Sequence, residues 1–320
     1  MEKQVLSIFP HKYRHLVLKL NALLKNPRLW TNWNRNFAIE DKPVLLLSMP
    51  RSGSSWLGEV LAQSRSIRYL REPITSVYMK SAFEPVSFFI PDKCLNHTAH
   101  DQAVTNAFTA KLNYFNSVLH NKNDWLDPTI KRKLLIKEIN PLCLDYFQGK
   151  FDIKVIYLER CPYAIAKSFD ALNWRSEELF SRRFDLQTLE KLKVIKDDLF
   201  EQCFFYQMGF LQGVISAIVE PSLKLSDCIQ VSYENLILDT QAELKKIADF
   251  LSIDNMKELT DYIVESFSDS QSANLGSFST KRNKHQLIDR IRNNKLEKEY
   301  LITLQAYELG FYGYKNYDDD

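Results

Sequence analysis

The stretch Val44–Leu57 reads VLLLSMPRSGSSWL and joins an apolar run to a polar turn and a second apolar segment. The run has the length of a buried strand. Pro50 and Gly53 interrupt it, and Ser54 and Ser55 then lead into WLGEVLA, which has the apolar pattern of a helix. The stretch therefore predicts a strand, a tight turn and the start of a helix.

This arrangement has the chemistry of an anion-binding site. The first amides of a helix have no partner inside the helix, and the helix dipole favours negative charge there. Gly53 lets the backbone approach an oxyanion closely. Arg51 adds a charged fork, and the serine hydroxyls add donors. The Gly-Lys-Ser/Thr signature of nucleotide hydrolases is absent, so we predict a different phosphate-type loop.

The residues Pro50–Leu57 resemble the 5′-phosphosulfate loop of sulfotransferases that use 3′-phosphoadenosine 5′-phosphosulfate (PAPS). Their Arg-Ser-Gly-Ser-Ser form is closest in style to the carbohydrate-type sulfotransferases. Enzymes of the family that act on small soluble acceptors usually carry Lys at the Arg51 position. The resemblance implies that the donor is bound by Arg51, Ser52, Gly53, Ser54, Ser55 and Trp56.

Length and composition are those of a globular protein with a sizeable core. The chain has 320 residues, 45% of them hydrophobic and 26% charged, and we expect one domain over residues 1–320. The net charge of +2 gives no reason to expect a nucleic-acid partner. Five scattered cysteines without a C-x-x-C pair indicate free thiols in a reducing compartment. Because neither a signal peptide nor a membrane-length apolar run is visible, we predict a cytoplasmic protein.

Two segments outside the loop have predicted roles in binding. Residues 10–25 have the pattern of a basic amphipathic helix, which either packs on its own domain or makes peripheral contact with an anionic membrane. Residues 74–130 are the least regular part of the chain, and we expect them to form an acceptor-side lid. His97 and His100 lie in this lid without a third metal ligand nearby, so no metal site is predicted.

A candidate catalytic base follows the short predicted strand at residues 67–70. Glu72 precedes Pro73, which predicts an extended or turn conformation facing a cleft. A similar Tyr-Leu-x-Glu-Pro segment follows the loop in carbohydrate sulfotransferases. Sulfuryl transfer to a hydroxyl needs a group that takes the acceptor proton, and we assign it to Glu72. The alternatives are a structural Glu72 and a lid histidine as base, which would be His97, His100 or His120.

A second core strand is predicted at Leu134–Ile139. Lys137 lies near its carboxyl end, where ligands bind in open α/β sheets. It either faces the transferred sulfonate or is an ordinary lysine at the strand edge.

Residues Ile153–Ser168 repeat the pattern of strand, proline turn and helix. Arg160 at the strand end and Ser168 in the helix can reach one phosphate. They resemble the 3′-phosphate segment of the same family, Leu-x-Arg-Asp-Pro-Arg-x-x-x-x-Ser. Cys161 replaces the usual Asp and Tyr163 the usual Arg, which puts the tightness of the turn and the strength of phosphate binding in doubt.

The C-terminal half supplies further candidates. Residues 171–215 are predicted to be helical and to offer acceptor contacts from Trp174, Arg175, Arg182 and Arg183. A third strand leads into Tyr233 and Glu234, for which we expect structural roles. The polar segment 268–285 resembles the family's C-terminal basic loop, which implies phosphate contacts from Lys281 and Arg282. A closing helix is predicted over 286–310, followed by a Gly-Phe-Tyr-Gly-Tyr tail.

Together these features predict an α/β fold, with a central parallel sheet flanked by helices and a P-loop-like nucleotide site at the strand ends. The resemblance implies transfer of a sulfuryl group from PAPS to an acceptor hydroxyl, on a carbohydrate, a lipid headgroup or another small molecule, without a metal. One alternative is an ATP-dependent P-loop small-molecule kinase. Another is a non-catalytic membrane-surface or scaffold protein that uses residues 10–25.

Overall fold

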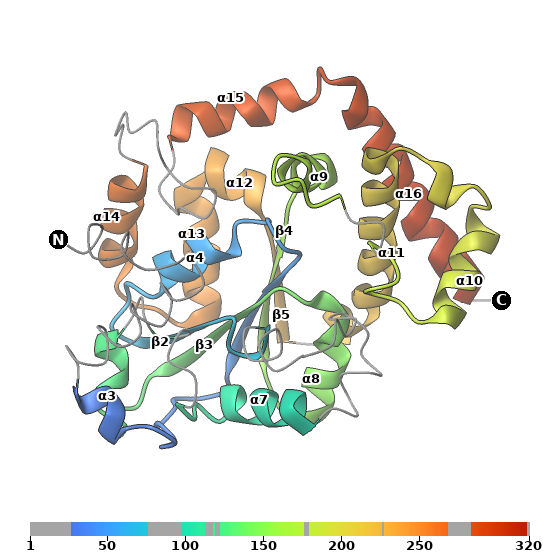
Figure 1. Cartoon of the computed structure of the whole chain (residues 1–320). Helices are drawn as coiled ribbons and strands as arrows, with labels where there is room; N and C mark the ends of the chain where they lie inside the picture. Colours follow the sequence, from blue (N-terminus) through green and yellow to red (C-terminus); the bar gives the residue numbers. More distant parts are fainter. Residues whose placement is uncertain are drawn as a thin grey trace, which may run out of the picture.

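A five-stranded parallel sheet with the order β2-β3-β1-β4-β5 forms the centre of the molecule (Figure 1). The computed structural model describes residues 27–75, 98–112, 118, 122–175, 179–225, 227–267 and 283–318. The strands are β1 (Val44–Ser48), β2 (Ile67–Arg71), β3 (Lys133–Glu138), β4 (Lys154–Glu159) and β5 (Asp227–Ser232). The predicted α/β fold with a parallel sheet is confirmed.

The central strand β1 explains why the deciding stretch has no alternation of polar and apolar residues. Leu45 and Leu47 belong to the hydrophobic cluster on one face of the sheet. Val44 and Leu46 belong to the cluster on the other face. A parallel strand covered by helices on both faces buries every side chain, and all five residues of β1 are buried.

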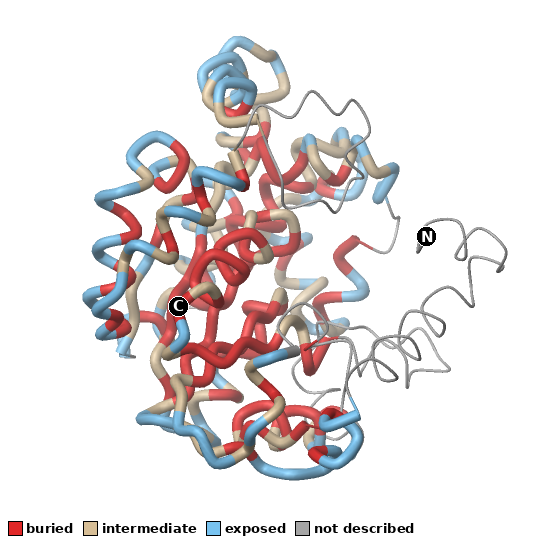
Figure 2. Tube along the Cα trace, turned by 90° about the vertical axis from the view of Figure 1, so that its left-hand side faces the viewer, coloured by how far each residue is buried: buried red, intermediate tan, exposed pale blue. Residues whose placement is uncertain are grey.

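Helices cover both faces of this sheet, and the buried residues run through the middle of the molecule (Figure 2). The face of Leu46 is covered by α4 (Ser54–Leu61), α12 (Tyr233–Leu238), α13 (Thr240–Leu251), α14 (Met256–Ser266) and α15 (Lys284–Asn294). The cluster of Leu45 includes residues of α3 (Pro27–Thr31), α7 (Thr98–Phe108), α8 (Leu144–Lys150), α9 (Pro162–Asp170), α10 (Leu186–Ile195), α11 (Phe204–Leu225) and α16 (Lys298–Asp318). Short 3-10 turns complete this face at η2 (Lys122–Trp125), η3 (Pro141–Cys143) and η4 (Leu199–Glu201).

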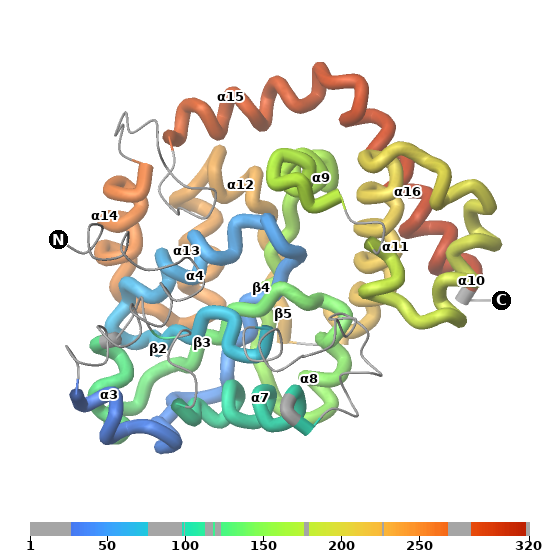
Figure 3. Tube along the Cα trace, in the orientation of Figure 1, coloured from blue at the N-terminus to red at the C-terminus, as the bar shows by residue number. Residues whose placement is uncertain are grey.

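The helices α11 and α16 lie side by side (Figure 3) with their backbones in close contact. A Cβ atom at Gly213 would lie 2.1 Å from the carbonyl oxygen of Tyr307, and one at Gly310 would lie 2.3 Å from that of Phe210. The sequence predicted that the closing helix ends at residue 310 and that a tail follows. This prediction is wrong, because α16 continues to Asp318. Its glycine serves helix packing and does not end the helix.

The described part of the predicted lid, 74–130, contributes to the core. Val104 and Phe108 of α7 and Trp125 of η2 are buried in the same cluster as Leu45. The helix α7 of this segment spans Thr98–Phe108. This part of the segment is thus a layer that covers the sheet.

Other features bear on the predicted surroundings of the chain. The four cysteines that the structure describes are free, which agrees with the expected thiols. Within the described ranges, no helix combines the length and the apolar character needed to cross a membrane. The predicted amphipathic helix at 10–25 lies outside the described residues.

Candidate active site

The turn between β1 and α4 has the geometry expected of an anion-binding loop. Arg51 and Gly53 both adopt left-handed backbone conformations, with φ of 71° and 93°. The first costs a non-glycine residue about 1–2 kcal/mol, and the second has no room for a side chain, because a Cβ atom would lie 2.4 Å from the ring of Tyr233. Ser48 donates to the hydroxyl of Ser54 at 2.8 Å and so joins the strand end to the helix start.

The turn between β4 and α9 lies directly beside this loop. Arg160 donates from Nη1 to the carbonyl oxygen of Arg51 at 2.6 Å, and Arg51 donates from Nε to the hydroxyl of Ser168 at 2.9 Å. The guanidinium of Arg160 also lies 4.7 Å from the ring centre of Tyr233. The structure therefore brings together three residues that the sequence assigned to two separate phosphate segments.

The turn that lacks the family's usual Asp is held from elsewhere in the chain. Pro162 begins α9, and Cys161 precedes it as the N-cap without a side-chain capping bond. The backbone N–H of Cys161 donates instead to Oε1 of Glu234 at 3.1 Å. Of the two structural roles expected for Glu234, fixing a turn or pairing with an arginine, the structure shows the first.

The candidate base Glu72 lies at the carboxyl ends of β2 and β3. Its backbone N–H donates to the carbonyl oxygen of Lys137 at 2.8 Å, and its carboxylate accepts from the ammonium of Lys137. Its φ of 48° is left-handed, so of the two conformations expected before Pro73, extended or turn, the structure shows the turn. The N–H of Glu72 extends the strand pairing by one bond, and the chain must then turn at once.

Lys137 is a buried cation, with a side chain only 2% exposed. Its burial lowers the pKa of the ammonium, and the charge of Glu72 opposes this shift. The carboxylate of Glu72 therefore stabilises the charged form of Lys137, and the ammonium of Lys137 fixes the position of one carboxylate oxygen of Glu72. Neither of the two roles considered for Lys137, facing the transferred sulfonate or lying at the strand edge, included this pairing.

Sequence reasoning missed Glu138, which is 1% exposed. It accepts from the backbone N–H of Ile74 at 2.7 Å and from the hydroxyl of Thr75 at 2.5 Å. Burial raises its pKa to about 7, and the bond from Thr75 opposes the shift. These bonds fasten the turn that follows Glu72. The signal was present as a second charged residue inside an otherwise apolar strand.

Of the other predicted site residues, some are buried in the protein and others lie outside the described residues. Trp56 is 6% exposed and donates from Nε1 to the hydroxyl of Ser266 at 3.1 Å, with its ring centre 5.3 Å from that of Phe267. His100 is 3% exposed and packs on Tyr146, with ring centres 5.9 Å apart. Outside the described residues lie Lys281, Arg282, His97 and His120.

Of the proposed acceptor contacts, Trp174 lies beside the anion-binding loop. Its ring centre is 6.0 Å from the guanidinium of Arg51, and it is 40% exposed. Arg175 pairs with Asp170 of α9. Arg183 is buried and donates to the carbonyl oxygen of Leu179 at 2.5 Å. Among the described residues, no group of three or more His, Cys, Asp or Glu side chains is arranged to hold a metal ion.

A family model described as the sulfotransferase domain matches residues 41–299 of this chain. The chain therefore belongs to the sulfotransferase domain family and is an enzyme of the sulfuryl-transferring class. The match begins just before β1 and ends in α16, so it includes both strand–turn–helix units and the pair formed by Glu72 and Lys137.

Solved structures of sulfotransferases are similar to this chain. The sulfotransferase domain of the curacin biosynthetic pathway has 18% identity and a TM-score of 0.46, covering 84% of this chain and 98% of its own. The sulfotransferase domain of the Synechococcus PCC 7002 olefin synthase has 20% identity and a TM-score of 0.45, covering 86% and 97%. Mouse sulfotransferase SULT7A1 complexed with PAP has 16% identity and a TM-score of 0.37, covering 92% and 95%. No curated protein matches the chain.

Proposed function

We propose that this enzyme transfers the sulfuryl group of PAPS to a hydroxyl of an acceptor. The observation that supports this most directly is the convergence of Arg51, Arg160 and Ser168 across the two strand–turn–helix units. One unit offers the amides at the start of α4 and a guanidinium for a phosphosulfate. The other offers a guanidinium and a hydroxyl for a second phosphate. A donor with phosphate at both the 5′ and 3′ positions fits this pair of sites.

Two of these residues can form further hydrogen bonds with such a donor. In the part of the chain that the structure describes, the buried Nε of Arg160 has no hydrogen-bond partner. Buried donors of this kind are normally satisfied, and a phosphate oxygen would satisfy this one. The hydroxyl of Ser168 can accept from Arg51 and still donate to a phosphate. We assign Lys281 and Arg282 to the same phosphate on the resemblance alone.

The chemistry that this arrangement can perform is an in-line displacement at sulfur. A bond forms between the acceptor oxygen and sulfur, and the bond between sulfur and the bridging phosphate oxygen breaks. The acceptor proton passes to the carboxylate of Glu72, which Lys137 holds in place. The departing 3′-phosphoadenosine 5′-phosphate (PAP) carries negative charge, which Arg51 and the amides at the turn into α4 stabilise.

Arg51 acts in this scheme as an electrostatic clamp, because a guanidinium keeps its proton in proteins. Arginine and amide groups supply the neutralising charge, so the scheme requires no metal. The acceptor carries a hydroxyl, and the Arg-Ser-Gly-Ser-Ser motif favours a carbohydrate over a lipid headgroup or another small molecule. Trp174 beside Arg51 offers a ring on which a sugar can stack.

Calorimetric titration with PAP, and in parallel with ATP and magnesium, tests this function. We expect PAP to bind in the micromolar range and ATP to bind much more weakly, since ATP lacks a 3′-phosphate. The reverse preference would identify a kinase-like enzyme. Binding of neither nucleotide, together with binding to anionic vesicles, would favour the non-catalytic membrane-surface alternative.

A further inference from the structure

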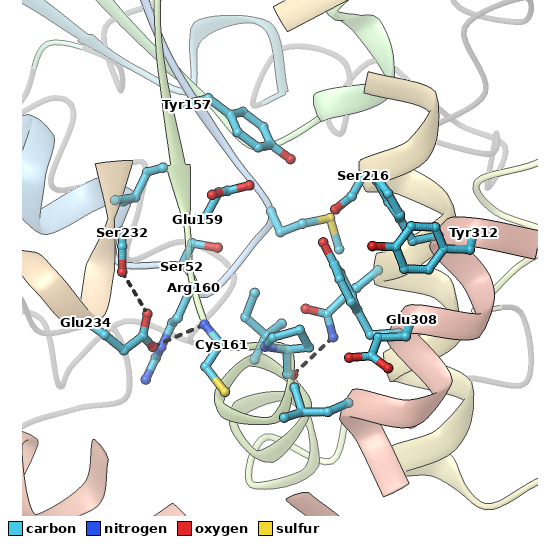
Figure 4. A pocket seen from close by; sticks show the side chains of 18 residues that line it. Ser52, Tyr157, Glu159, Arg160, Cys161, Ser216, Ser232, Glu234, Glu308 and Tyr312 are labelled. Atoms are coloured by element: carbon cyan, nitrogen blue, oxygen red, sulfur yellow. Dashed lines mark hydrogen bonds between the residues drawn. The ribbon is translucent and has the colours of Figure 1, made fainter. Parts of the chain in front are cut away.

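A cavity of about 490 Å³ lies on the side of the β4–α9 turn that faces α11 and α16 (Figure 4). It reaches the anion-binding loop at Ser52 and the second turn at Cys161, but neither Glu72 nor Lys137 lines it. Its size is that of a site for a small molecule. The mechanism proposed above makes no use of it.

Carboxylates dominate the charge of this cavity. Glu159 comes from the end of β4 and Glu308 from α16, on opposite sides of the space (Figure 4), and Glu234 comes from the start of α12. Within the described ranges, neither Glu159 nor Glu308 forms an ion pair with a lysine or arginine. Burial raises the pKa of Glu159, and the charge of Glu234 adds to the shift.

Among the described residues, the one lysine or arginine that lines the cavity is Arg160, and part of its guanidinium is already bonded. Its guanidinium donates to the carbonyl oxygen of Arg51 and stacks over Tyr233. A phosphate placed in the cavity would meet three carboxylates and compete with these contacts. The cavity is therefore electrostatically unsuited to the phosphates of the donor.

Four aromatic rings contribute to the lining. They come from β4 and from one face of α16, namely Tyr157, Tyr307, Phe311 and Tyr312. The negative faces of such rings attract cations, and rings combined with carboxylates are the usual environment of bound ammonium groups. The buried hydroxyl of Ser52, 1% exposed, also borders the cavity, and it has no hydrogen-bond partner among the described residues.

We propose that this cavity binds a small organic ammonium ion, with its positive group between Glu159 and Glu308 and its alkyl part against the rings of α16. The hydroxyl of Ser52 can accept or donate a bond to a polar end of such a ligand. The cavity adjoins the two phosphate segments, which contribute Ser52 and Arg160 to its lining. Its occupancy does not depend on whether the enzyme uses PAPS.

Choline is a suitable probe, because its uncharged isostere 3,3-dimethyl-1-butanol has nearly the same shape. Saturation-transfer NMR and titration of the full chain measure binding of each compound. We expect choline to bind at least about tenfold more tightly than the isostere, since a desolvated cation–aromatic contact contributes up to about 2 kcal/mol. Equal affinities, or no binding of choline, would overturn the proposal.

Variants locate the binding. Glu159→Gln combined with Glu308→Gln is expected to lower choline affinity about tenfold or more, and Tyr312→Leu, at a 60% exposed position, is expected to weaken it less. Glu190→Gln removes the same charge from the exposed face of α10 and should leave choline binding unchanged. Wild-type affinity in the double variant, or displacement of choline by saturating PAP, would show that the cation does not occupy a separate site here.

Discussion

At the end of the sheet where we propose that the donor binds (the donor end), where β1 and β4 finish, the candidate groups come from two motifs that are each continuous in the sequence. Arg51, Arg160 and Ser168 meet there through a short chain of hydrogen bonds. At the base end, where β2 and β3 finish, Glu72 is held by the buried ammonium of Lys137, and its turn is fastened by the buried carboxylate of Glu138. The donor end is open to a ligand, whereas the base end is largely satisfied from within.

This difference determines what substitutions should do. A group at the donor end completes its hydrogen bonds with a ligand, so its removal should appear first in binding or in charge stabilisation. A group at the base end completes its bonds within the protein, so its removal should change proton transfer or stability while nucleotide binding is retained.

Glu72→Gln should have the largest effect. The variant keeps the shape of the side chain but cannot take the acceptor proton, so we expect kcat to fall about 10²–10⁴-fold. PAP affinity should be unchanged, because the donor end is intact. The rate is measured as release of PAP from PAPS with an acceptor that supports wild-type turnover, and the affinity by calorimetry.

Glu40→Gln is the matched control for this variant. Glu40 pairs with Lys133, with 3.2 Å between the charged atoms. Lys133 is the first residue of β3, whereas Lys137 lies near the end of this strand. Replacement of Glu40 also leaves a lysine of β3 without a carboxylate, but far from the acceptor. We expect wild-type turnover, and normal turnover in Glu72→Gln itself would remove Glu72 as the base.

Arg51→Ala should follow, with turnover lowered by about 10²–10³-fold through the loss of one preorganised charge at the leaving phosphate. Arg51→Lys keeps the charge and should recover part of the rate, although lysine cannot form the same fork. Recovery is measured by the same PAP-release assay. An inactive lysine variant that binds PAP normally would show that the bond to Ser168, and not the charge, is what turnover requires.

The donor end was largely predictable because its determinants are local. An apolar run, Pro50, Gly53 and two serines specify the strand, the turn and the helix start, and the second unit repeats this logic around Pro162. Contacts between the units were not predictable from the sequence. The engagement of Cys161 by Glu234 and the contact of Gly53 with Tyr233 depend on β5 lying beside β4.

The base end was predictable only as a list of residues. The sequence marked Glu72 and Lys137 separately, but their pairing depends on the parallel register of β2 with β3, in which Arg71 lies opposite Lys137. The left-handed backbone of Glu72 opposes the preference of a residue before proline, and it is adopted because tertiary bonds fix both sides of the turn. The buried Glu138 was marked in the sequence only as a second charged residue in an apolar strand, and its bonds to Ile74 and Thr75 depend on the tertiary fold.

Glu138→Gln tests the base end through the pH dependence of stability. The folded protein holds the Glu138 proton up to a pKa of about 7, above the ordinary value of 4.5. Between these values the folded state binds more protons than the unfolded state, so the free energy of unfolding should decrease as pH rises. The glutamine variant lacks this contribution. Denaturant titrations between these two pH values should show that the free energy of unfolding of the wild type falls by about 3 kcal/mol relative to that of the variant. The same pH dependence of the unfolding free energy in both proteins would contradict the raised pKa of Glu138.

Arg160→Ala should have the smallest of these effects, on donor affinity. Loss of a charge-assisted contact with the 3′-phosphate is expected to weaken PAP binding about 10–100-fold. AMP lacks that phosphate, so its affinity should change little. Arg175→Ala is the control, because Arg175 is a neighbouring guanidinium already paired with Asp170, and it should leave both affinities unchanged.

The comparison of PAP with AMP also separates two roles of Arg160. Besides its predicted phosphate contact, Arg160 supports the loop by donating to the carbonyl oxygen of Arg51. If that support were its main contribution, the 5′-phosphate site would be damaged as well, and calorimetry would show PAP and AMP losing the same factor. A selective loss for PAP would place the 3′-phosphate at Arg160, and an equal loss would make Arg160 a positioning residue for Arg51.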